Sequence, residues 1–235
     1  VFLNFLNKKK IFLGAVLLFS LLGMAVINFE TAWIVLGVFS LIFLIYIFSI
    51  SKDTRSFAGL PLIVFIVSVL FVFLNPIIGS FLNSANLNFV EVRPSWSGTF
   101  DIIKNSLKVD PFLGSGPGTF VYNWLNFRPQ EINLTQFWAA RFNYGVGFIP
   151  SLFATAGILA ALLWVCFLVI LILQFLKILA RKDDNDRENM SLMLASFFAS
   201  LYLWVFNIIY VPSFTLTFPA FLFTGLLIAE LSRNG

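Results

Sequence analysis

A series of about six apolar segments constrains this chain more than any other feature of its sequence. They run approximately over residues 11–28, 31–50, 57–82, 146–175, 190–210 and 211–229. A helix that crosses a bilayer satisfies its own backbone hydrogen bonds and needs about 20 apolar residues. The sequence therefore predicts an all-α integral membrane protein with about six transmembrane helices. Three of them lie in residues 1–82 and three in residues 146–235, with a loop over residues 83–145 between the two groups. The short connections near residues 28–30 and 210–213 are predicted to be tight helical hairpins.

Composition agrees with a bilayer environment and excludes several classes of site. The chain is 60% hydrophobic and 11% charged, whereas about a quarter of an ordinary soluble domain is charged. Cys166 is the only cysteine, which excludes a disulfide framework, and histidine is absent, which removes the commonest general base and zinc ligand. A metal cluster held by thiolates is therefore not expected. No cofactor is predicted for the chain. The chain begins with Val1 rather than Met, which indicates a fragment of a longer protein.

The distribution of lysine and arginine predicts the orientation of the helices. When the six segments are threaded alternately through the membrane, ten of the 15 basic residues fall on one side, close to helix ends. That side is expected to be cytoplasmic. Both ends of the chain and a short loop near residues 177–189 then face the cytoplasm, and the loop over residues 83–145 faces outward. The formal charge of +4 is thus better explained by topology than by affinity for nucleic acid.

The outer loop is rich in aromatic residues and is predicted to be ordered. Residues Ser97 to Val109 carry apolar side chains at helical spacing with lysines on other faces, which indicates a short amphipathic helix at the membrane interface. The following apolar segment, residues 146–175, is longer than a bilayer requires. It either tilts strongly or emerges on the outer side, in which case its outer end belongs to the same region as the loop.

The most unusual stretch of the loop runs from Asp110 to Phe120 and reads DPFLGSGPGTF. Gly114, Gly116 and Gly118 alternate with other residues, and two prolines restrict the backbone further. Consecutive backbone amides in such a turn can bind phosphate oxygens. A tight structural turn between two interfacial helices is an equally good interpretation, because the spacing does not match a dinucleotide-binding fingerprint.

Three arginines, Arg93, Arg128 and Arg141, lie in the same loop. A guanidinium is permanently charged and presents a planar set of donors that suits diphosphate oxygens. The alternative for each is an interaction with lipid headgroups or with the acidic residues of the loop.

These motifs together resemble the C-terminal half of the O-antigen ligase and polymerase superfamily. They are Arg93-x-x-Trp96, the Asp110-to-Phe120 turn, and an external segment that leads into a long helix through Ala154-Thr155-Ala156-Gly157. The motifs cover about residues 85–160, and the rest of the chain is similar only in its number of helices.

The resemblance implies a function and a set of site residues. Members of this superfamily transfer a glycan from a polyprenyl diphosphate carrier to a glycan, lipid or protein acceptor at the outer face of the bacterial inner membrane, without a metal. Arg93 would contact the diphosphate and Arg141 would be a second contact, with Arg128 as the reserve candidate for substrate binding. The other substrate-binding residues would be Trp96, Gly114, Gly116, Gly118, Asn143 and Tyr144.

The sequence departs from the ligases at one position. Where they carry a histidine, eleven positions before the downstream glycine, this chain has Val146. This favours a polymerase or oligosaccharyltransferase relative, or one that has lost activity, with Glu91 or Asp101 as the candidate base. A transporter or flippase of lipid-linked glycans and a non-catalytic protein of cell-envelope assembly are the alternative functions.

Overall fold

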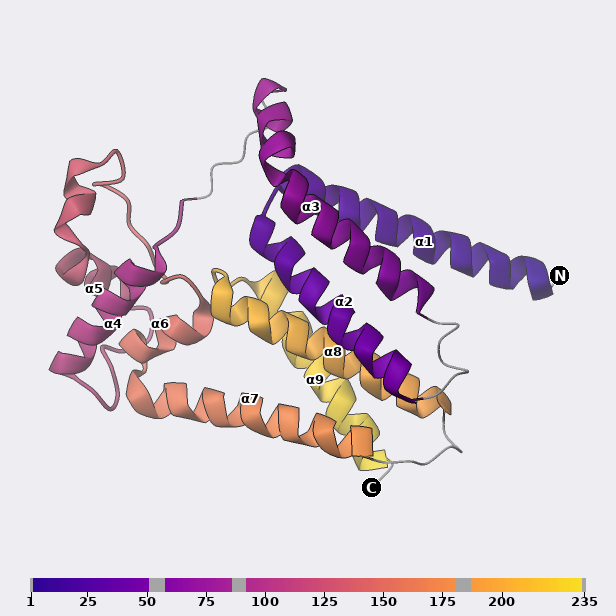
Figure 1. Cartoon of the computed structure of the whole chain (residues 1–235). Coiled ribbons are helices and arrows are strands. Elements are labelled where there is room, and N and C mark those ends of the chain that lie inside the picture. The colour runs from indigo at the N-terminus through magenta and orange to yellow at the C-terminus, as the bar shows by residue number, and fades with distance from the viewer. Residues whose placement is uncertain (1, 51–57, 86–91, 181–186, 234–235) are drawn as a thin grey trace. The chain divides into compact units, whose positions relative to one another are not determined.

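The computed structural model describes residues 2–50, 58–85, 92–180 and 187–233, and every regular element in these ranges is a helix. The chain divides into two compact units, Val1–Glu91 and Val92–Gly235. Figure 1 shows the helices in chain order, α1 to α3 in the first unit and α4 to α9 in the second. The predicted all-α class is confirmed.

Five of the described helices are long and apolar enough to cross a membrane, so the protein is a multi-pass membrane protein. Their apolar side chains are largely exposed in the structure, as expected of surfaces that face lipid. The first predicted span corresponds to α1 (Phe2–Ile27), in which the apolar stretch Ile11–Ile27 is shorter than the other five. The five are α2 (Glu30–Ile50), α3 (Gly59–Ser84), α7 (Gly157–Ala180), α8 (Arg187–Ile209) and α9 (Phe214–Arg233).

The described part of the first unit contains one tight turn between helices and one closely packed helix pair. Helices α1 and α2 are joined by a tight turn in which Asn28 has a φ of 52°, as predicted for this short connection. Helices α2 and α3 pack together through Trp33 and Phe71, whose rings are stacked with centroids 4.0 Å apart. Near the α1–α2 turn, the side-chain amide of Asn75 donates to the carboxylate of Glu30 (3.0 Å).

The second unit contains the predicted α8–α9 hairpin, whose two helices share a buried hydrogen-bond cluster. The Thr224 hydroxyl lies 2.6 Å from that of Ser200, and the indole N–H of Trp204 donates to the Thr224 oxygen (3.1 Å). Helix α7 contacts this pair through aromatic rings, since Trp164 lies 4.9 Å from Trp204 and 5.9 Å from Phe221. Large side chains thus fill the space between α7 and the hairpin.

The remaining helices form a cap, defined here as residues 92–156, at one end of the α7–α9 bundle. Figure 1 shows the cap at the end where α7 begins and α8 ends. Its apolar core includes Ile102, Phe120, Trp124 and Ala154, all 1% exposed or less. The cap contains α4 (Trp96–Val109), α5 (Phe120–Phe127), the 3-10 helix η2 (Gln130–Leu134) and α6 (Phe148–Thr155).

Helix α4 matches the predicted amphipathic helix to within one residue. Its first turn begins at Ser95, whose hydroxyl accepts a hydrogen bond from the amide of Gly98 (3.0 Å), an N-cap arrangement that satisfies one of the free amides at a helix start. Ile102, Ile103 and Ser106 face the cap interior, whereas Phe100 and Lys104 are exposed.

The long apolar segment over residues 146–175 is not one tilted helix. It is interrupted at Ala156, between α6 and α7, and Gly157 has a left-handed φ of 73°. Helix α6 packs on α4 and α5, so the first part of this segment belongs to the cap. The sequence did not predict this interruption, because the segment is predominantly apolar.

Candidate functional site

The glycine-rich turn, residues 110–118, lies directly against the α6–α7 interruption. A Cβ atom added to Gly114 would lie 2.6 Å from the amide nitrogen of Gly157 and 2.7 Å from the carbonyl carbon of Thr155. Gly114 and Gly157 both have positive φ, at 67° and 73°, a region that favours glycine. The absence of a side chain at both positions therefore lets two stretches of backbone touch.

Backbone hydrogen bonds join the glycine turn to both helices at the interruption. The amides of Ser115 and Gly116 donate to the carbonyls of Ala154 (3.1 Å) and Thr155 (2.8 Å), which lie at the end of α6. In return, the amide of Ile158 in the first turn of α7 donates to the carbonyl of Pro111 (3.0 Å). The turn thus supplies partners for groups that helix ends leave unsatisfied, and it caps α6 and α7 together.

Buried and partly buried polar side chains support the same contact. The Ser106 hydroxyl donates to the Ala154 carbonyl (2.9 Å), and so does that of Ser115 (3.1 Å). The side-chain amide of Asn123, a buried residue of α5, donates to the Ser115 hydroxyl (2.6 Å). Helices α4, α5 and α6 are therefore connected to the turn by a continuous hydrogen-bonded network, which fixes the position of α6.

The three residues before α6, residues 145–147, pass between α4 and the end of α8. A Cβ on Gly145 would lie 3.0 Å from the hydroxyl oxygen of Thr99, and a Cβ on Gly147 would overlap the carbonyl of Ile208. Val146, which the resemblance pairs with the ligase histidine, is 2% exposed, and its amide donates to the Thr99 hydroxyl (3.0 Å). In this chain that position belongs to the packed interior.

Beside this segment the cap contains a pocket of about 390 Å³. Three of the predicted substrate-binding residues line it, namely Gly118, Asn143 and Tyr144. Sequence reasoning missed the contribution of α6, which supplies Phe148, Ser151, Leu152 and Thr155. A volume of this size lies within the range of small-molecule sites in proteins.

The pocket lining is partly polar and partly apolar, and it carries no carboxylate, lysine or arginine among the residues that the structure describes. Ser151 is already engaged, because its hydroxyl accepts from the Gly145 amide (2.8 Å) and donates to the Gly147 carbonyl. The side chains of Asn143 and Tyr144 are exposed, and neither hydrogen-bonds to any described part of the chain. They are therefore free to bind a neutral hydroxylated ligand, with Phe148 and Leu152 as an apolar wall.

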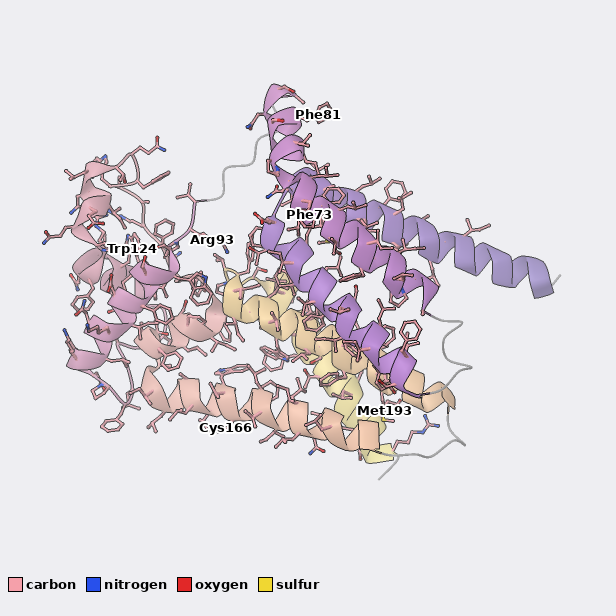
Figure 2. The ribbon with its side chains drawn as sticks, in the orientation of Figure 1. Phe73, Phe81, Arg93, Trp124, Cys166 and Met193 are labelled. Carbon is pink, nitrogen blue, oxygen red and sulfur yellow. The ribbon has the colours of Figure 1, made fainter. Side chains whose placement is uncertain are left out.

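The three loop arginines differ in what they contact. Arg93 donates to the carbonyl of Ile209 at the end of α8 (3.1 Å), and its guanidinium lies 5.5 Å from the centre of the Tyr210 ring. Figure 2 shows Arg93 on the segment that leads into α4. Arg128 donates to the carbonyl of Trp138 within the cap. Arg93 thus ties the cap to the α8–α9 hairpin, and Arg128 closes the loop after α5.

Arg141 is the loop arginine that is exposed, and it lies two residues before Asn143 of the pocket lining. Its side chain forms no hydrogen bond or ion pair with the described residues. A guanidinium without such bonds to the described residues can bind an anion without first breaking one of them.

The other predicted site residues lie apart from the pocket lining. Trp96 is 42% exposed and stacks on Phe100, with ring centroids 5.8 Å apart. Asp101, one of the two candidate bases, is exposed on α4. Glu91, the second candidate base, lies outside the described residues. Gly114 and Gly116 form the backbone contact of the glycine turn with α6 and α7.

A signal for the missed residues exists in the sequence. Ser151 and Thr155 are four residues apart in an otherwise apolar stretch, FIPSLFAT, and this spacing places them on the same face of a helix. We expected a single long helix here, so a polar face at its outer end was not considered separately.

Comparison of the chain with protein-family models, with curated proteins and with solved structures finds no match. The functional interpretation therefore rests on the geometry of the cap and on the sequence motifs.

Proposed function

We propose that this chain transfers or polymerises a glycan, taking it from a polyprenyl diphosphate carrier to an acceptor at the outer face of the cytoplasmic membrane. In this proposal the protein has six spans, both ends of the chain face the cytoplasm, and the cap lies outside. No metal takes part. The proposal follows from the resemblance of the loop motifs to the O-antigen ligase and polymerase superfamily.

The observation that carries the proposal is the neutral, hydroxyl- and amide-bearing pocket at the bundle end where α7 begins. Asn143 and Tyr144 offer uncommitted donors and acceptors, and Phe148 offers an apolar ring. This combination suits a sugar, which presents hydroxyl groups on its edge and C–H groups on its faces. The adjacent membrane-spanning helices would keep the lipid part of the donor in the bilayer.

Arg141 is the residue that we assign to the leaving diphosphate. It is exposed and close in sequence to the pocket lining, whereas Arg93 already donates to the Ile209 carbonyl. The sequence analysis gave Arg93 as the first diphosphate contact, and we now propose Arg141 for that role. Arg93 becomes a positioning residue that holds the cap on the α8–α9 hairpin.

The proposed reaction is a direct displacement at the anomeric carbon. An acceptor hydroxyl oxygen forms a new bond to that carbon while the bond to the diphosphate oxygen breaks, and the hydroxyl proton leaves to solvent or to the departing diphosphate. The pocket contributes by holding the donor sugar in line with the acceptor. Arg141 contributes by stabilising the negative charge that develops on the diphosphate.

The test is release of the free diphosphate carrier by the protein reconstituted in liposomes with a polyprenyl diphosphate glycan and an acceptor. Arg141→Ala is compared with Lys104→Ala, which removes an exposed cation from α4 of the same cap. We expect release to fall about a hundredfold in Arg141→Ala, the usual cost of losing one charge-stabilising donor, and to be unchanged in Lys104→Ala.

Three results would contradict part or all of the proposal. Equal rates in wild type and Arg141→Ala would remove the assigned role of the arginine. The absence of carrier release by wild type, with donor moving across the bilayer, would assign transport instead. If neither release nor movement occurred, the chain would be a non-catalytic envelope protein.

A further inference from the structure

Three exposed apolar side chains gather where α4 leads into the glycine turn. Val109 is 78% exposed, Phe112 63% and Leu113 70%. They are named here the apolar tip. These residues lie in the cap rather than on a membrane-spanning helix, so exposure to lipid along a span does not account for them. Three large apolar groups within five residues of one turn indicate a surface that is covered in the native setting.

The position of the apolar tip relative to the membrane follows from its contact with α7. Gly157 is the first residue of the apolar stretch Gly157–Gln174, which is long enough to cross a bilayer. The carbonyl group of Phe112 touches Gly157, since a Cβ atom on that glycine would overlap it. The tip therefore lies beside the point where a spanning helix begins, which is the boundary between the bilayer and water.

Four backbone groups of the turn are hydrogen-bonded within the protein. The amide of Leu113 donates to the Asp110 carboxylate (3.2 Å), and the carbonyl of Pro111 accepts from Ile158 (3.0 Å). The amides of Ser115 and Gly116 donate to the end of α6. Irregular backbone is tolerated next to hydrocarbon only when its polar groups have partners within the protein.

We propose that the apolar tip is a membrane-binding surface, in which Phe112 and Leu113 insert into the outer edge of the bilayer beside α7. The partner is the lipid bilayer itself, at the level where the acyl chains meet the headgroups. Lys108, which is exposed next to Val109, remains among the headgroups. Insertion fixes the glycine turn, and with it the pocket residue Gly118, at a defined depth. This surface is independent of the proposed glycan transfer.

Site-directed spin labelling in liposomes tests the proposal. Cys166, the only cysteine, is first replaced by serine, and a label is then placed at residue 113 through Leu113→Cys, or at residue 112 through Phe112→Cys. Both side chains are exposed, so neither replacement opens a cavity in the cap. Two controls set the scale: Leu163→Cys on α7, which is 72% exposed within a span, and Asp101→Cys on the polar face of α4.

Labels at residues 112 and 113 are expected to collide with membrane-dissolved oxygen as the residue 163 label does. Their collisions with a water-soluble nickel chelate should be at least about tenfold rarer than those of the residue 101 label. Transfer of an apolar group from water into the bilayer is favourable by more than 1.4 kcal/mol, so the inserted position is populated at least about ten times more than the position in water. Chelate access equal to that of residue 101 would place the tip in water and overturn the proposal. Protection from both reagents would also overturn it, because a protein and not lipid would then cover the tip.

Discussion

Substitution of Gly114 by alanine is expected to weaken the contact between the glycine turn and the α6–α7 interruption. The added Cβ would lie 2.6 Å from the amide nitrogen of Gly157 and 2.8 Å from that of Ala156. Both neighbours are backbone atoms, which cannot rotate away as a side chain does. The turn must therefore move, and the hydrogen bonds that Ser115 and Gly116 donate to the end of α6 must lengthen or break.

The expected magnitude has two parts. A left-handed φ of 67° is costly for alanine, by about 1–2 kcal/mol. The loss of two hydrogen bonds to α6 adds about 1 kcal/mol each. The free energy of unfolding should thus decrease by roughly 3–4 kcal/mol in Gly114→Ala.

Gly118→Ala is the matched control for this measurement. Gly118 belongs to the same turn and has a similar φ of 74°, yet a Cβ there would meet no atom within 4 Å. Gly118→Ala should lower the free energy of unfolding only by the cost of the left-handed φ, about 1–2 kcal/mol. The difference between the two variants, about 2 kcal/mol, isolates the contact with α6 and α7.

The two variants can be compared by SDS titration in mixed micelles, with hydrogen–deuterium exchange over residues 111–119 as a local readout. In Gly114→Ala, but not in Gly118→Ala, the amides of Ser115 and Gly116 should exchange faster than in wild type. If both variants lose the same stability and keep the same protection, the glycine turn does not cap α6, and our account of these glycines is wrong.

Two further predictions concern buried hydrogen bonds in the second unit. Thr224→Val leaves the partners Ser200 and Trp204 unsatisfied. It should lower the free energy of unfolding, measured by SDS titration, by about 1–3 kcal/mol. An unchanged free energy of unfolding would contradict this prediction. Trp124→Phe removes the hydrogen bond from the indole to the Ala140 carbonyl (3.0 Å). It should speed proteolysis after α5, because the loop over residues 128–142 loses its hydrogen bond to that helix. An unaltered digestion pattern would contradict this prediction.

The sequence was sufficient for the features that depend on local pattern. Apolar length predicted the membrane-spanning character of α2, α3, α7, α8 and α9, and the period of apolar residues predicted α4 to within one residue. The two tight connections, near Asn28 and after Tyr210, were also predicted correctly. These features depend on local sequence because a helix in a membrane forms its backbone hydrogen bonds within the same segment.

The candidate site was only partly predictable. Asn143, Tyr144 and Gly118 were identified in advance and lie together around the pocket. Their assignment came from motif position, since nothing local in the sequence shows that residues 118 and 143 meet. The contribution of Ser151 was missed because α6 was taken as the outer part of a longer helix.

The amino-acid sequence by itself determined that this protein lies in a bilayer, where five membrane-spanning helices fall along the chain, and which loop contains the candidate site. Only the tertiary structure decided what the glycines and arginines of that region do. The contacts of Gly114 with Gly157 and of Arg93 with Ile209 join residues 43 and 116 positions apart. Such contacts depend on how the cap packs against the bundle, and no periodicity along the chain records them.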